Sequence, residues 1–140
     1  MTDGERVRVE GIADAAFVDR VHVALEQLGR DVPGLSDEDH GLFALAVGEI
    51  AANVAAHAVG AEGSPVHVSL ALGADEVTLS AVFVDDAVAG DIDLAGVSMP
   101  APEAESGRGL AIAVAAMDEF VYRAEPGGAG NRWELRRRRR

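Results

Sequence analysis

Hydrophobic and polar residues follow one another along the chain with two different spacings, and each spacing predicts one kind of element. A spacing of three and four residues predicts an amphipathic helix over residues 13–28, which Gly29 is expected to end. A long helix is predicted over residues 37–59, where Ser36 precedes three acidic residues as a typical N-cap does. A third helix is expected to begin near Gly109.

Alternation of apolar and polar positions predicts the strands. These are expected at residues 6–10, 66–72, 77–83, 119–124 and 131–135, the second and third forming a hairpin. Residues 86–106 are rich in alanine, proline, glycine and acids, and so long a connection is typical of a lid. The order of elements predicts one α/β domain over residues 1–140. Its expected architecture is a two-layer sandwich with a mixed, mostly antiparallel sheet and helices on one face.

Composition narrows the classes of function. Of the 140 residues 49% are hydrophobic, enough for a core, and the absence of cysteine excludes disulfides and thiolate sites. The start of the chain lacks the apolar run of a signal peptide, and no apolar segment reaches the length of a membrane helix, so a cytoplasmic protein without membrane contact is expected. All 12 basic residues are arginine, and the absence of lysine excludes a Walker-type phosphate site.

The net charge of -12 is unevenly distributed. Residues 37–119 hold fifteen acids against a single basic residue, Arg108, so this stretch is expected to repel nucleic acid. Five arginines follow one another at 136–140, and a run of like charge at a terminus predicts a solvated, disordered tail that offsets the acidic body. A contact of this basic tail with an acidic partner is the alternative.

The long helix carries a row of polar residues. Within residues 42–61 the only polar side chains are Glu49, Asn53 and His57, spaced four apart, so they share one face of a helix that is otherwise apolar all round and is expected to be buried. A solvated stripe would normally carry further charged residues, whereas alanine fills the neighbouring positions here. The row is therefore predicted to line a cleft.

Two further segments supply candidate ligand groups. Asp85 ends a predicted strand and is followed by small residues, so its carboxylate can accept a hydrogen bond from an adenine amino group while a flat base approaches closely. After the expected lid, the segment Gly107, Arg108, Gly109 and Leu110 opens the third helix. Its backbone N–H groups and its arginine are suited to binding phosphate.

The order of these segments resembles the ATPase module shared by gyrase, heat-shock chaperones and histidine kinases, the GHKL superfamily. The resemblance covers about residues 36–135 and is closest to the anti-sigma-factor serine kinases. It implies a Bergerat-type fold with an ATP lid. It also implies that Asn53 binds the Mg²⁺ that bridges the ATP phosphates and that Glu49 orients or deprotonates the attacking hydroxyl.

The resemblance assigns the remaining residues to nucleotide binding. His57 completes the row on the helix, and Asp85 reads adenine. Asn131 stands on the last strand where a threonine is usual in the family. The segment that binds phosphate consists of Gly107, Arg108, Gly109 and Leu110.

The resemblance leaves two functions open. One is an ATP-dependent serine/threonine kinase that acts on an anti-anti-sigma (STAS-type) protein and sequesters a sigma factor, regulating transcription in a stress response as a homodimer. The other is a partner-binding module of the same fold that binds ATP weakly or not at all. The family has a glycine two residues after its adenine-reading acid, and here Ala87 takes that place, with Ala89 two residues further on. These alanines favour the second function because a methyl group crowds the base.

Overall fold

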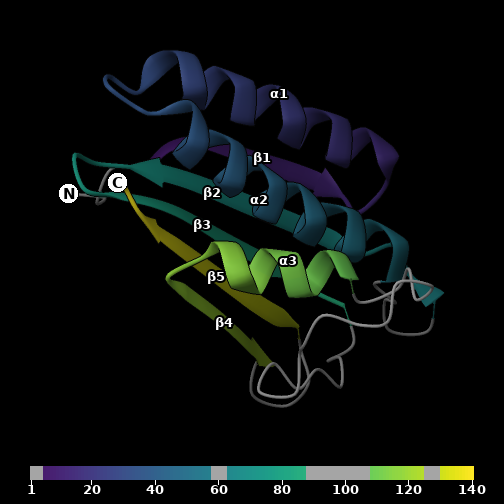
Figure 1. The fold of residues 1–140 in the computed structure, drawn as a ribbon. Helices are drawn as coiled ribbons and strands as arrows, with labels where there is room; N and C mark the ends of the chain where they lie inside the picture. Colours follow the sequence, from purple (N-terminus) through teal and green to yellow (C-terminus); the bar gives the residue numbers. More distant parts are fainter. Residues whose placement is uncertain (1–4, 58–62, 88–107, 125–129) are drawn as a thin grey trace.

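The computed structural model describes residues 5–57, 63–87, 108–124 and 130–140. They form three helices and five strands (Figure 1). In chain order the elements are β1 (Glu5–Ile12), α1 (Ala15–Asp31), α2 (Asp37–His57), β2 (His67–Ala74), β3 (Thr78–Asp85), α3 (Arg108–Ala116), β4 (Glu119–Ala124) and β5 (Asn131–Arg138). All eight elements expected from the sequence are present, in the expected order.

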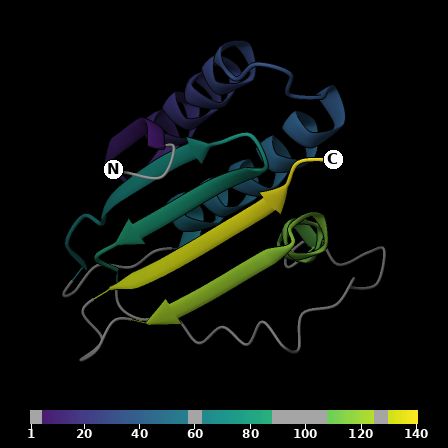
Figure 2. The same cartoon turned by 90° about the vertical axis from the view of Figure 1, so that its left-hand side faces the viewer.

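The five strands form one sheet in the order β1-β2-β3-β5-β4, and each neighbouring pair is antiparallel. The three helices lie on one face of this sheet, with α2 between α1 and α3, and the other face is open in the described part of the chain (Figures 1 and 2). The predicted two-layer α/β sandwich is therefore confirmed, with a sheet that is antiparallel at every described pairing. The core fills the space between the layers, and its largest fully buried side chains include Phe17, Phe43, Ile50, Leu70 and Phe83.

Helix α1 begins as a capped helix but ends later than expected. The Asp14 carboxylate accepts a hydrogen bond of 3.0 Å from the Phe17 N–H. Gly29 does not end the helix as predicted but lies inside it, beside the ring of His40. A Cβ at Gly29 would come within 2.6 Å of His40 Nε2. This glycine therefore serves close packing between α1 and α2, and α1 continues to Asp31.

Helix α2 begins as predicted, since the Ser36 hydroxyl accepts a hydrogen bond of 3.0 Å from the Asp39 N–H. The expectation that α2 is buried all round is wrong. One side of it packs on the sheet, but Leu45 keeps 41% of its surface exposed, and Ala52 and Ala56 are exposed as well. Three helices side by side on one sheet leave each of them an outward stripe, and on α2 that stripe is apolar. No helix in the described ranges is long and apolar enough to cross a membrane.

The arginine run at residues 136–140 is not a disordered tail. Strand β5 continues to Arg138, and Arg137 is buried, with its guanidinium 3.1 Å from the Asp39 carboxylate. Arg139 donates to the carbonyl oxygens of Asp75 and Pro33, and the Arg140 N–H donates to Asp39. Acids and carbonyl groups of the same chain thus hold this segment. The prediction failed because a charge run says nothing about distant partners.

Candidate functional site

Glu49 and Asn53 lie one turn apart on α2, and both are partly buried. The opposite flank of α2 meets α1, where His40 Nε2 donates a hydrogen bond of 2.8 Å to the Leu25 carbonyl oxygen. At about 100° per residue, Glu49 and Asn53 point away from that contact. Since α3 packs against the other side of α2, these two polar side chains belong to the flank of α2 nearer α3 (Figure 1).

The other residues predicted on this side are described only in part. His57 is the last residue of α2 in the described ranges, and Arg108, Gly109 and Leu110 form the first turn of α3. The expected helix opening is therefore present. Gly107 and residues 88–106 of the expected lid lie outside the described residues. The roles of His57 and of the phosphate segment remain predictions.

Asp85 lies at the end of β3 and is 5% exposed. Its Oδ1 accepts two hydrogen bonds of 2.9 Å, one from the Ala87 N–H and one from Asn131 Nδ2. Asn131 stands directly opposite Asp85 in the pairing of β3 with β5. The structure thus brings together three predicted site residues that lie up to 46 positions apart.

The neighbouring acid, Asp86, faces elsewhere. Its carboxylate accepts a hydrogen bond of 2.7 Å from the His67 N–H and lies 3.3 Å from His67 Nδ1. This pair borders a hollow of about 440 Å³ at the ends of β1, β2 and β3. Asp86 therefore contacts the start of β2, whereas its neighbour Asp85 contacts β5.

Gly130 allows the close approach of β5 to Asp85. Its φ is +153°, and a Cβ there would lie 2.3 Å from the Asp85 carbonyl oxygen. Only glycine fits such a contact without a shift of the backbone. A glycine directly before a predicted strand is a signal that the sequence itself offers for such a close approach.

Tyr122 of β4 is a further residue that sequence reasoning missed. Its hydroxyl donates to Asn131 Oδ1, and its ring lies 4.6 Å from the ring of Trp133, its partner in register. The Asn131 amide therefore meets Tyr122 with its oxygen and Asp85 with its nitrogen. Finding this contact requires the register of β4 against β5, which the sequence alone does not supply.

The oxygen atoms that these residues offer suit an adenine nucleotide. Oδ1 of Asp85 holds both hydrogen bonds, and no described residue donates to Oδ2, which leaves that oxygen free to accept from an amino group. Asn53 offers an amide oxygen, a ligand type that Mg²⁺ accepts together with phosphate oxygens and water. Within the described ranges no three acidic or histidine side chains gather into a metal site.

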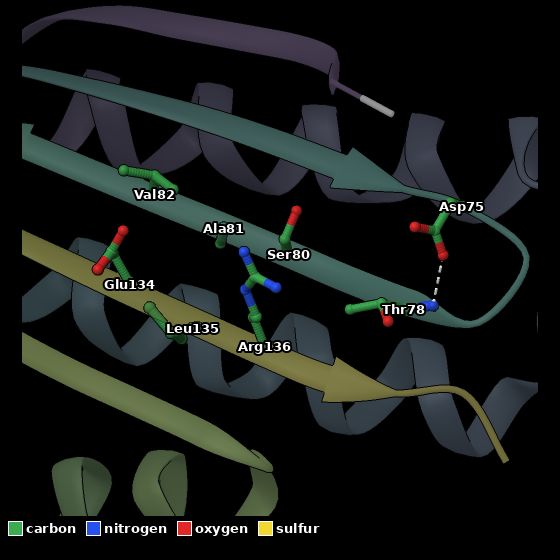
Figure 3. Close-up of a pocket in the computed structure, with 8 residues that line it drawn as sticks. All are labelled: Asp75, Thr78, Ser80, Ala81, Val82, Glu134, Leu135 and Arg136. Atoms are coloured by element: carbon green, nitrogen blue, oxygen red, sulfur yellow. Dashed lines mark hydrogen bonds between the residues drawn. The ribbon is translucent and has the colours of Figure 1, made fainter. Parts of the chain in front are cut away.

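A second hollow lies on the open face of the sheet, away from the predicted site. It measures about 380 Å³, and Arg136 reaches over it from β5 towards Ser80 of β3 (Figure 3). Carboxylates flank it, those of Asp75 and Glu134. Two carboxylates against one guanidinium leave the hollow net negative, and none of the predicted site residues lines it.

The antiparallel sheet, the helix layer and the acid at the end of β3 define an α/β sandwich of the ATPase type. The chain belongs to the histidine kinase-like ATPase domain family, whose sequence model matches residues 12–136. This membership supports the GHKL superfamily and, with it, nucleotide binding.

A similar solved structure is the histidine kinase domain of the blue-light activated histidine kinase from Erythrobacter litoralis EL346. It shares 20% sequence identity with this chain at a TM-score of 0.55. The match covers 86% of this chain and 58% of that chain, so the likeness concerns the fold. No curated protein sequence matches the chain.

Proposed function

We propose that this protein is an anti-sigma factor with ATP-dependent serine/threonine kinase activity toward an anti-anti-sigma protein of the STAS type. It would bind Mg·ATP between α2, α3 and the end of β3, and it would hold a sigma factor in a homodimer that controls transcription in a stress response. The observation that carries the proposal is the pair Glu49 and Asn53, one turn apart and partly buried on the flank of α2 nearer α3.

The two side chains have separate tasks in this proposal. Asn53, with Mg²⁺, anchors the phosphates, while the Glu49 carboxylate acts on the partner's hydroxyl. The hydroxyl oxygen bonds to the γ-phosphorus as the bond from that phosphorus to ADP breaks. The hydroxyl proton passes to Glu49. Products are a phosphoserine or phosphothreonine on the partner, and ADP.

A partner-binding module without catalysis is the second candidate. Ala87 supports it, because this alanine is 3% exposed directly beside Asp85, at the place where the family has a glycine. A methyl group in that position occupies room that a base would need. Sigma-factor binding would then continue without ATP.

Calorimetric titration with ATP, with and without Mg²⁺, separates the candidates. The kinase proposal expects Mg-dependent ATP binding by the wild type and its loss in Asp85→Asn, which turns an acceptor towards the base into a donor. The matched control is Asp86→Asn, since that acid binds His67. Phosphate on a STAS-type protein from the same organism, located by mass spectrometry, then tests transfer. Binding without transfer, or no binding at all, leaves the partner-binding module.

A further inference from the structure

Tyr122 and Asp85 lie on strands that are not neighbours, yet Asn131 connects them. Strand β5 lies between β3 and β4 in the sheet. The Tyr122 hydroxyl donates to Asn131 Oδ1, and Asn131 Nδ2 donates to Asp85 Oδ1 at 2.9 Å. The three side chains form one line of hydrogen bonds across three strands, on the face that carries the helices.

The Tyr122 hydroxyl and the Asp85 carboxylate, which can only accept, together hold the Asn131 amide in one orientation. An asparagine side chain presents an acceptor at one end and donors at the other, so it can be turned by 180°. Donation to Oδ1 holds the oxygen towards Tyr122 and the nitrogen towards Asp85, where Nδ2 also lies 3.4 Å from the Ala87 carbonyl oxygen. The ring of Tyr122 is itself held by its contact with Trp133.

The orientation of Asn131 in turn fixes the Asp85 carboxylate. Its two donors in the described part of the chain, Asn131 Nδ2 and the Ala87 N–H, bind the same oxygen, Oδ1. Two hydrogen bonds to one oxygen prevent rotation of the carboxylate and leave Oδ2 as the acceptor. Because the group is 5% exposed, small changes in its angle would decide whether a ligand can meet Oδ2.

We infer that Tyr122 is a positioning residue for base selection: acting through Asn131, it holds Asp85 Oδ2 where only a base with an exocyclic amine at C6 is accepted. A carboxylate oxygen accepts a hydrogen bond from the amine of adenine and repels the carbonyl oxygen that hypoxanthine and guanine carry at that carbon. The inference rests on the proposed nucleotide site and adds the part of the chain that sets its preference among purines.

The test compares ATP with ITP, which differs from it by that amine. Tyr122→Phe removes only the hydroxyl and keeps the ring against Trp133. We expect ATP affinity to fall about five-fold, the value of one hydrogen bond, while ITP affinity changes less than about two-fold. The ratio of the two affinities, measured by calorimetry, is the readout. A residue needed only for folding would weaken both nucleotides alike.

The same Tyr122→Phe substitution is also made in an Asn131→Ala variant, which lacks the connecting amide. If Tyr122 acts through Asn131, then Tyr122→Phe has no further effect on the ATP/ITP ratio once the amide is gone. A second fall of similar size would overturn the relay. The variants are compared at a temperature where the single tryptophan, Trp133, reports a folded domain.

The outcomes separate this inference from the proposed function. A wild type that binds neither nucleotide defeats both. A wild type that prefers ATP, together with a Tyr122→Phe variant whose ATP/ITP ratio is unchanged, leaves the nucleotide site standing and overturns the role of Tyr122.

Discussion

Arg137 and Asp39 form a buried ion pair between β5 and the first turn of α2. The guanidinium and carboxylate lie 3.1 Å apart, their side chains are 5% and 2% exposed, and the two residues are 98 positions apart in the chain. Arg137 also donates to the Ala116 carbonyl oxygen at the end of α3. One guanidinium thus joins two helices and a strand at the same end of the sandwich.

Removing one partner of this pair should destabilise the domain strongly. Asp39→Asn leaves the Arg137 charge buried without a counter-charge, for which a loss of about 3 to 5 kcal/mol is expected. Urea unfolding followed by Trp133 fluorescence measures it. Asp37→Asn, an exposed change in the same helical turn, is the control and should cost under about 1 kcal/mol. Equal losses in both variants would contradict the special role of Asp39.

The same carboxylate should make stability depend on acid pH. Burial alone would raise the pKa of Asp39, but hydrogen bonds from the Arg140 N–H, Ser36 and Arg137 outweigh it and hold the pKa below its ordinary value of 3.8. A depressed pKa gives stability that is present above 3.8 and is lost as pH falls through the lower folded value. The free-energy difference between wild type and Asp39→Asn should therefore shrink below about pH 4. A constant difference down to pH 2 would refute this.

Gly130 should not tolerate a side chain. Gly130→Ala combines a positive φ with a contact of 2.3 Å to the Asp85 carbonyl oxygen, whereas Gly63→Ala has a positive φ and no atom of the described residues within 4 Å. Backbone strain at positive φ costs about 1 to 3 kcal/mol at either position, and the clash adds about 1 to 3 kcal/mol at Gly130 alone. The free energies of unfolding of the two variants are measured by heat or urea, and their difference gives the contribution of the clash. Indistinguishable variants would show that β5 can move away from Asp85.

If the protein is a kinase, substitution of Glu49 and substitution of Asn53 should affect different steps. Glu49→Ala should lower phosphotransfer by about two to four orders of magnitude and spare ATP affinity, because a general base acts on the hydroxyl. Asn53→Ala should weaken Mg·ATP binding about ten-fold through the lost metal ligand. Affinity and transfer are measured separately for each variant. Equal losses of ATP affinity would refute the division of tasks.

Ala87→Gly tests the position where the chain departs from the family. Removal of the methyl should tighten ATP binding about five-fold if that group crowds the base. Because Ala87 is 3% exposed, the apo protein should melt at a slightly lower temperature. Calorimetry and a melting curve give the two quantities. Unaltered affinity would mean that the alanine is tolerated, and this would favour the kinase over the partner-binding module.

The elements of this fold could be predicted because their local signals agree with the tertiary structure. The β2–β3 hairpin shows strict alternation, and Ser36 caps α2 through its own hydroxyl. The helix end predicted at Gly29 is wrong because glycine occurs both at helix ends and at close contacts between helices. Only the position of His40 in space distinguishes the two.

The sequence allowed individual residues of the candidate site to be predicted, but not the contacts between them. Asp85 is predicted from its place at a strand end and Asn131 from the family resemblance, and the structure pairs them. Tyr122 depends on how β4 is aligned with β5, and the inward side chain of Arg137 depends on an acid 98 positions away. Contacts of this kind are set by the whole sheet, so a pattern along one segment does not reveal them.

Strand β5 follows every other described element in the chain, but it lies inside the sheet between β3 and β4. During synthesis the inner edge of β3 therefore has no partner until residues 131–138 have left the ribosome, and β4 has no sheet to join. Asp39 likewise has no ion-pair partner until Arg137 has been synthesised. The domain must consequently complete its core after translation of its last strand rather than grow strand by strand, and a nascent chain stalled before residue 131 would expose an unpaired β3 edge to chaperones.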